Sequence, residues 1–223
     1  AETKKKVLVL EQYRYDQALT TLNGVLNDGR IGNLVSYEMV THRWIDQDEN
    51  NAGGYGNTAW RIDPQFPLGT LFDRGMHATT RLTRLFGKPL SMYALGTKLR
   101  DGFGDYDHVL MTLAHGPDAR SPAGVHGTFS FAGCMDDRNN YFHIRGTSGT
   151  IRVEPDRLKI TGENAGVLDL PQADCSLAMW QRCADWFSDN RTPTYGARES
   201  QDDIGTLVAA DRSIREGRNV LLD

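Results

Sequence analysis

The chain has 223 residues, of which 39% are hydrophobic and 24% charged, and its net charge at pH 7 is −4. This composition is typical of a globular protein with a substantial core, and it shows neither the basic excess of a nucleic-acid-binding protein nor an apolar run near the ~20 residues of a membrane span. The cysteines, Cys134, Cys175 and Cys183, make no metal spacing and no even disulfide set. That pattern favours a reducing, cytoplasmic setting.

The N-terminal segment predicts a strand followed by a helix. Residues 7–13 (VLVLEQY) are a short aliphatic and aromatic run, as in a buried strand. Asp16 is a suitable N-cap, and Gly29 supplies a C-terminal stop. The apolar residues between them have helical spacing: Leu19, Leu22, Val25 and Leu26.

A second strand, a loop and a second helix are predicted next. Residues 31–44 alternate partly between apolar and polar positions, as in a half-buried strand. Residues 46–57 form a polar, glycine-rich loop. The helix that carries Asp73 and His77 ends at Gly87. Its apolar stripe consists of Leu71, Ala78, Leu82, Leu85 and Phe86.

The remainder of the chain predicts short strands and then two helices. Between residues 90 and 170, strand-like runs are separated by Gly, Pro, Asp and Asn turns. The helix at 176–189 is expected to face inward with Leu177, Trp180, Ala184 and Phe187. The helix at about 199–216 is expected to do so with Ile204, Leu207, Val208 and Ile214. A last strand, NVLLD, closes the chain.

This order of elements predicts the fold class, since two helices before a run of strands and two after it do not alternate as βαβ units do. It indicates an α+β fold, a single domain over residues 1–223 with a large, open, mostly antiparallel sheet and helices packed on one face. The other face would be exposed or would meet a partner subunit.

The glycine-rich stretch GYGNTA (54–59) matches the G-x-G-x-x-A pattern of dinucleotide-binding turns. That pattern requires a strand before it and a helix opening on it. The preceding DQDENNAG is no strand, and the following WRIDPQFP contains two prolines. We therefore interpret the stretch as a surface loop and expect no nucleotide site in it.

Asp73 and His77 are separated by four residues, so a regular helix would stack them on one face. In one interpretation Asp73 only caps the helix, and His77 is an incidental histidine. In the other, Asp73 orients His77, whose second ring nitrogen accepts a proton from a substrate hydroxyl. The spacing by itself favours the first interpretation.

The other candidate residues form a possible carbohydrate-binding group. Tyr13 and Arg14 lie at the end of the first predicted strand, and His42, Trp60 and Arg61 flank the glycine-rich loop. Aromatic faces and arginine donors suit a sugar, although ordinary packing explains these residues equally well. The remaining histidines have no ligand spacing, so no metal site is predicted.

Several segments in register resemble one protein family. EQYRYDQALTTLNGVLNDGRIGNL (11–34), GGYGNTAWRIDPQFPLGTLFDRGMHATTRLTRLFGKP (53–89), FHIRGTSGTIRV (142–153) and SIREGRNVLL (213–222) are similar to the C-terminal domain of the Gfo/Idh/MocA oxidoreductases. The family includes glucose–fructose oxidoreductase and inositol dehydrogenase. The resemblance implies a sugar or polyol substrate, and homo-oligomer contacts through the sheet.

The resemblance also implies roles for single residues and a coenzyme. The D-x-x-x-H aspartate and histidine of the family correspond to Asp73 and His77, which favours the catalytic interpretation of the pair. Full-length members hold NAD(P) in an N-terminal Rossmann domain and use a lysine from an E-K-P motif. This sequence has neither, so we expect no cofactor bound by this chain, with NAD(P) held on a missing or separate domain.

Three hypotheses follow for the function. The chain is the substrate-binding and oligomerisation half of an NAD(P)-dependent sugar or polyol oxidoreductase, with Asp73 and His77 handling the proton. Alternatively, it is a stand-alone, redox-inactive domain that works as a cofactor-free acid/base enzyme such as an isomerase, lyase or cyclase. A third alternative is a non-catalytic binding or assembly protein.

Overall fold

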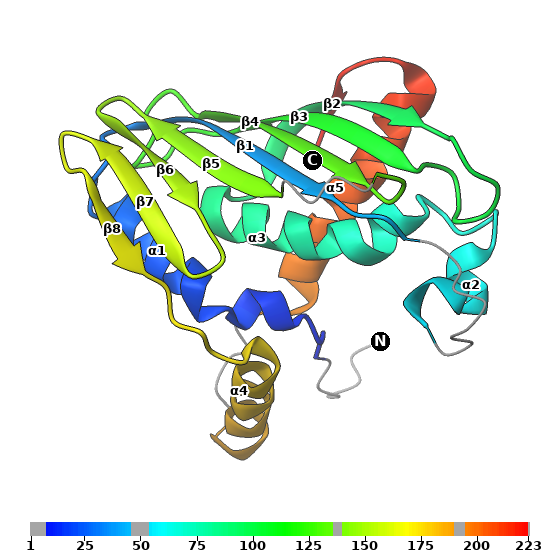
Figure 1. The fold of residues 1–223 in the computed structure, drawn as a ribbon, viewed down its shortest axis with the longest axis horizontal. Helices are drawn as coiled ribbons and strands as arrows, with labels where there is room; N and C mark the ends of the chain where they lie inside the picture. Colours follow the sequence, from blue (N-terminus) through cyan, green and yellow to red (C-terminus); the bar gives the residue numbers. More distant parts are fainter. Residues whose placement is uncertain (1–7, 46–53, 136–139, 190–194, 223) are drawn as a thin grey trace, which may run out of the picture.

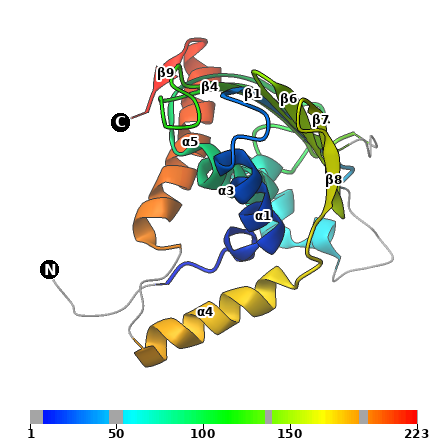
Figure 2. The same ribbon diagram turned by 90° about the vertical axis from the view of Figure 1, so that its left-hand side faces the viewer.

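A computed structural model describes residues 8–45, 54–135, 140–189 and 195–222. One layer is a curved sheet of nine strands, and the helices gather on one side of it (Figure 1, Figure 2). The helices are α1 (Gln17–Asn27), α2 (Ala59–Ile62), α3 (Met76–Phe86), α4 (Cys175–Asp189) and α5 (Ala197–Glu216). The strands are β1 (Leu34–His42), β2 (Pro89–Thr97), β3 (His108–His115), β4 (Val125–Ala132), β5 (Tyr141–Gly146), β6 (Gly149–Val153), β7 (Arg157–Gly162), β8 (Gly166–Asp169) and β9 (Val220–Leu221).

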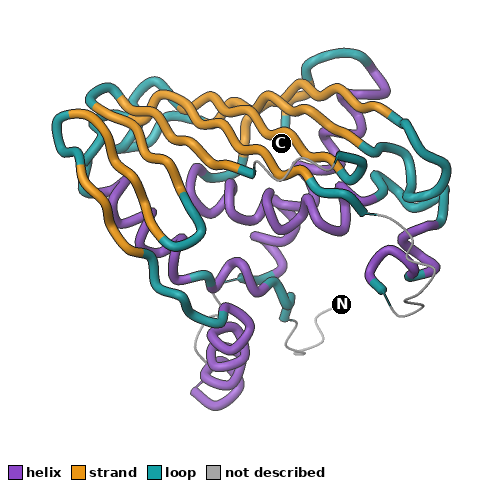
Figure 3. Tube along the Cα trace, viewed as in Figure 1, coloured by secondary structure: helices purple, strands orange, loops and turns teal. Residues whose placement is uncertain are grey.

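The strand order is β8-β7-β6-β5-β1-β4-β3-β2-β9. Neighbouring strands are antiparallel except for β1 and β4, which run parallel. Figure 3 shows the two layers, with strands in orange and helices in purple. The α+β class and the open, mostly antiparallel sheet predicted from the sequence are confirmed.

The side chains of the central strands alternate between the helices and the open face of the sheet. In β3, Val109, Met111 and Leu113 are buried, while the residues between them are partly exposed. Tyr37 of β1 stacks on Phe86 of α3 with ring centroids 4.4 Å apart. One core therefore fills the space between sheet and helices.

The first predicted strand is wrong over its described part. Residues 8–11 have no regular structure, and a 3₁₀ turn, Gln12–Tyr15, follows them. The carboxylate of Glu11 accepts a hydrogen bond from the backbone N–H of Tyr13 and thereby caps this turn. A local side-chain acceptor thus competes with strand pairing for the backbone donors, and a short apolar run contains no sign of that.

The inward face predicted for α4 is also wrong. Leu177, Trp180 and Phe187 are 57%, 55% and 61% exposed, and Met179 and Cys183 are the buried residues of the helix. Helical spacing shows that an apolar stripe exists, but it does not show whether the fold covers it. In α5, Leu207 is buried and Ile214 packs against the core, whereas Ile204 and Val208 are exposed.

A buried carboxylate joins α5 to α3. Asp203 is fully buried and accepts hydrogen bonds from the hydroxyls of Thr80, Thr83 and Tyr195. Burial raises the pKa of Asp203, although these hydrogen bonds act in the opposite direction. The guanidinium of Arg14 donates to Thr83 and to the backbone oxygen of Thr80, so the same cluster holds the 3₁₀ turn against α3.

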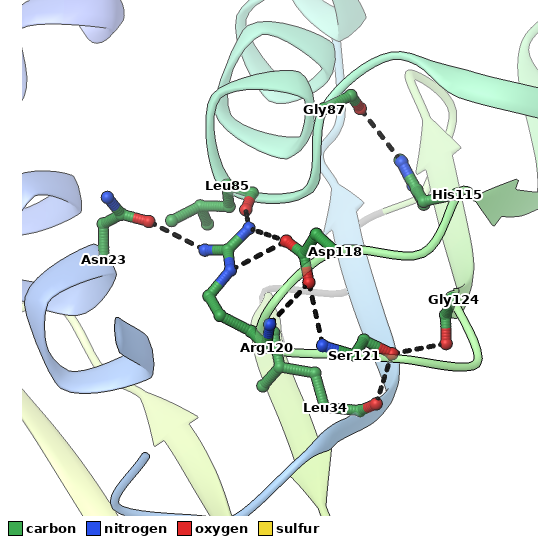
Figure 4. A network of polar contacts seen from close by, with 9 residues as sticks. All are labelled: Asn23, Leu34, Leu85, Gly87, His115, Asp118, Arg120, Ser121 and Gly124. Carbon is green, nitrogen blue, oxygen red and sulfur yellow. Dashed lines mark hydrogen bonds and ion pairs between the residues drawn. The ribbon is translucent and has the colours of Figure 1, made fainter. Parts of the chain in front are cut away.

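A second polar network connects the C-terminal end of α3 to the loop between β3 and β4 (Figure 4). Arg120 donates to the backbone oxygen of Leu85 at 2.7 Å and to the side chain of Asn23 at 3.0 Å. His115 donates from Nδ1 to the backbone oxygen of Gly87 at 2.9 Å, and its Nε2 accepts from the hydroxyl of Tyr37 at the same distance. These bonds satisfy carbonyl groups that a helix end leaves without intrahelical partners.

Candidate active site

The candidate site is built at the start of α3. Asp73 lies in a π-helical turn, Leu71–Gly75, and His77 lies in the first turn of the α-helix that follows. A Cβ at Gly75 would approach a methyl group of Leu71 to 2.5 Å, so a larger residue here would displace that buried side chain. A π-helical turn changes the angular spacing between residues, and such turns are frequent at functional sites.

Asp73 forms an ion pair with Arg61 of α2. The Nε of Arg61 donates to Oδ2 at 2.8 Å, and a second guanidinium nitrogen lies 3.5 Å from Oδ1. Arg61 also lies over the ring of Trp60, 4.1 Å from its centroid. Burial raises the pKa of Asp73, and the nearby His77 counteracts part of that shift. The ion pair with Arg61 acts in the same direction as His77.

His77 forms its hydrogen bond with Glu11. The Nδ1–H of His77 donates to Oε2 of Glu11 at 2.8 Å, and the side chains are 37% and 6% exposed respectively. Tyr13 packs against the imidazole with ring centroids 4.8 Å apart. Within the described part of the chain no residue hydrogen-bonds to Nε2 of His77. A buried carboxylate thus fixes the tautomer of a half-exposed imidazole, as in proton-transfer sites.

The structure brings most, but not all, of the predicted site residues together. Tyr13 contacts His77. Arg61 forms an ion pair with Asp73 and is stacked on Trp60. Arg14 is turned away, into the cluster around Thr80 and Thr83. His42 projects from the opposite face of the sheet, where its Nε2 lies 2.8 Å from the hydroxyl of Ser130.

Glu11 is the functional residue that sequence reasoning missed. The sequence predicts a buried strand at this position, and that prediction suggests no catalytic role for an acidic residue. Glu11 lies 66 positions from His77, so no local periodicity connects the two. Helical spacing predicted Asp73 as the hydrogen-bond partner of His77. The observed partner of Nδ1 is Glu11 instead.

The described part of the glycine-rich stretch does not have the geometry of a dinucleotide-binding turn. Gly54 to Ala59 forms a 3₁₀ turn, Tyr55–Asn57, followed by the four-residue helix α2, which is too short to supply a pyrophosphate-binding N-terminus. Among the described residues, no three His, Cys, Asp or Glu side chains are grouped to hold a metal.

No helix in the described ranges is long and apolar enough to cross a membrane. The three cysteines are not paired in disulfides.

Comparison with protein families identifies the class. Residues 19–152 match the GFO/IDH/MocA C-terminal domain. Because the match covers more than half of the chain, the chain belongs to the family of GFO/IDH/MocA C-terminal domains. A search of curated proteins finds no match.

Solved structures share the fold at low sequence identity. An oxidoreductase from Thermotoga maritima is 22% identical with a TM-score of 0.84, and the match covers 99% of this chain and 63% of that one. An oxidoreductase from Agrobacterium radiobacter, in complex with NAD⁺, L-tartaric acid and magnesium, is 19% identical with a TM-score of 0.76, over 96% and 64%. The aldose–aldose oxidoreductase of Caulobacter crescentus, complexed with glycerol, is 17% identical with a TM-score of 0.78, over 98% and 64%. The chain therefore spans less than two thirds of these relatives.

Proposed function

We propose that this chain is the substrate-binding and proton-handling half of an NAD(P)-dependent oxidoreductase that acts on a sugar or polyol. The observation that carries the proposal is the hydrogen bond between the buried carboxylate of Glu11 and Nδ1 of the half-exposed His77. Family membership and the NAD⁺ and aldose named for two of the similar structures support the reaction class.

In this proposal His77 is the general base during alcohol oxidation. With the ring proton held on Nδ1 by Glu11, Nε2 carries the lone pair that accepts the proton of the substrate hydroxyl. The resulting imidazolium is stabilised by the Glu11 carboxylate, and in carbonyl reduction the proton returns to the substrate. Glu11 is the positioning residue of the site, because it acts through His77.

Asp73 and Arg61 have an electrostatic and positioning role in the proposal. Their ion pair connects α2 to the start of α3, and the guanidinium of Arg61 is stacked on Trp60. The Asp73 carboxylate is also close enough to His77 for the imidazole to counteract part of the rise in the pKa of Asp73. It therefore adds a second negative charge near the imidazolium that forms when Nε2 is protonated.

The coenzyme belongs to another part of the enzyme in this proposal. NAD(P) would supply the hydride acceptor from a Rossmann domain carried elsewhere on the polypeptide or on a separate chain. Calorimetric titration of this chain with NAD and NADP should give no binding tighter than millimolar. Micromolar binding by this chain would overturn that assignment.

The open face of the sheet is the assembly surface in the proposal. Several large apolar side chains on β2 and β3 are exposed there, among them Leu95 at 54% and Leu110 at 38%. Pairing two such faces would bury them in a homo-oligomer. Light scattering coupled to size exclusion should give a multiple of the chain mass, and a monomer at all concentrations would argue against it.

Kinetics of the protein as its gene encodes it test the catalytic part of the proposal. His77→Gln should lower kcat for sugar or polyol oxidation by about 10²–10⁴-fold, the range for loss of a general base. Arg212→Gln, a change at an exposed residue of α5, should leave kcat within about twofold. Unchanged turnover in His77→Gln would refute the role of His77. Turnover without any nicotinamide would favour the cofactor-free acid/base alternative.

A further inference from the structure

Arg81 extends the surface around His77. It lies four residues after His77 on α3, so the two side chains share one face of the helix. Both contact Tyr13: the guanidinium carbon of Arg81 lies 4.3 Å from the centre of the tyrosine ring, and the imidazole centroid lies 4.8 Å from it. Tyr13 is therefore in contact with both the positively charged Arg81 and the proposed proton acceptor, His77.

The guanidinium of Arg81 has hydrogen-bonding capacity to spare. Its only ion pair within the described ranges is to Oδ2 of Asp16 at 3.9 Å, which is longer than a hydrogen bond. Its Nε is buried and has no hydrogen-bond partner. Arg84, one turn further along α3, instead donates three hydrogen bonds to the protein. A guanidinium carries five N–H donors, and the four on the terminal nitrogens of Arg81 remain for a ligand.

Arg81 also lines a cavity of about 270 Å³ between α1, α3 and the strands β1 and β5. Leu19, Met39 and Phe142 give this cavity an apolar floor. A small number of polar groups over an apolar floor is typical of small-molecule sites. The volume suits one monosaccharide and is below the ~300–1,000 Å³ of pockets for larger, drug-sized ligands.

The charged groups around the cavity favour a ligand with a single negative charge. Asp16 and Glu154 line it together with Arg81. Glu154 is already paired with Lys159 at 2.8 Å, and one oxygen of Asp16 accepts from the backbone of Ala18. A carboxylate matches the guanidinium fork in two parallel hydrogen bonds. A dianionic phosphate would face the Asp16 charge with one cation to balance it.

We propose that Arg81 makes this cavity selective for carboxylated monosaccharides, aldonates or uronates, over neutral polyols. The inference does not depend on the proposed function, since His77 is not among the described residues that line the cavity. The carboxylate binds the guanidinium of Arg81, and the carbon chain covers the apolar floor.

Titration with matched ligands tests this inference on the chain itself. D-Gluconate and D-glucitol differ in one carboxylate, and D-glucitol 6-phosphate is the phosphate arm. Binding is followed by NMR on the side chain of Arg81 and on the methyl groups of Leu19 and Met39, which line the cavity. Gluconate should bind roughly tenfold or more tightly than glucitol, because a charge-assisted hydrogen bond is worth about a factor of ten or more.

Variants assign the preference to Arg81. Arg81→Gln should bind gluconate and glucitol equally, and Arg81→Lys, which keeps the charge without the fork, should retain part of the preference. Arg212→Gln, an exposed change on α5, should behave as the wild type. Circular dichroism and thermal unfolding verify that each variant is folded.

Each other outcome has a defined meaning. A preference for gluconate that survives in Arg81→Gln, or tighter binding of the phosphate, overturns the assignment of Arg81 to a carboxylate. Equal binding of gluconate and glucitol also overturns it. If neither ligand shifts the resonances of Arg81, Leu19 and Met39, the inference fails, while the proposed function, which rests on Glu11 and His77, stands.

Discussion

Acidification should destabilise the protein through His115. This imidazole is 4% exposed and donates to the backbone oxygen of Gly87 (Figure 4). It also accepts from the hydroxyl of Tyr37, so the fold holds it in the neutral form. Burial lowers the pKa of His115 from 6.5 to about 4. Protonation therefore favours the unfolded chain over the interval between these two values.

The sign and size of the effect follow from this shift. The stabilisation is fully present above pH 6.5, declines as the pH falls below that value, and is lost once the pH passes below about 4. The difference between the two pKa values corresponds to about 3 kcal/mol in full, of which about 2 kcal/mol is lost by pH 5. Urea denaturation at pH 7.5 and pH 5, fitted for the free energy of unfolding, measures it.

A variant isolates the contribution of His115 from that of other titrating groups. His115→Gln should be less stable than the wild type at pH 7.5, since its hydrogen bonds are altered, but it should lose about 2 kcal/mol less between pH 7.5 and pH 5. The comparison variant is His126→Gln. That histidine is exposed, but its charge adds to the lowering of the His115 pKa, so the variant should keep most, but not all, of the wild-type pH dependence. An equal loss of stability in His115→Gln and the wild type would refute the reasoning.

Three further pairs of substitutions test the packing. Asp203→Ala should cost about 3 kcal/mol, because it leaves buried hydroxyls without an acceptor, whereas the neighbouring Asp202→Ala should cost less than about 1 kcal/mol in urea denaturation; equal costs would contradict the cluster. Gly127→Ala places a Cβ 1.9 Å from the ring of Tyr37 and should cost about 3 kcal/mol. Gly205→Ala, with no atom within 4 Å, should be neutral or stabilising in the same thermal assay, and the reverse order would be incompatible with the packing. On α4, Leu177→Ser should change stability by less than about 0.5 kcal/mol and Met179→Ser should cost about 2 kcal/mol; a larger cost at Leu177 would restore the face predicted from the sequence.

The sequence predicted those elements in which local signals and tertiary packing agree. The cap at Asp16 and the apolar spacing of α1 give the observed helix, and the short strands separated by turn residues give the sheet. Thr147 and Ser148 form the turn between β5 and β6. In these segments each local preference coincides with the fold, so pattern reasoning is sufficient.

Pattern reasoning failed where distant parts of the chain decide the structure. The pairing of Glu11 with His77 joins segments 66 positions apart. Residues 8–11 have no regular structure, in place of the predicted strand. Leu177 and Trp180 form the apolar stripe that was predicted, but the described fold leaves it exposed. The π-helical turn at Asp73 likewise alters the side-chain geometry that regular spacing predicts.

The tautomer of His77 tests the central claim most directly. Long-range ¹⁵N–¹H correlation spectra of the neutral imidazole show which ring nitrogen carries the proton. We predict a proton on Nδ1 and an unprotonated Nε2 in the wild type, with loss of that bias in Glu11→Leu. A wild-type His77 with its proton on Nε2 would contradict the proposed role, since no lone pair would then be available to accept a proton from a substrate.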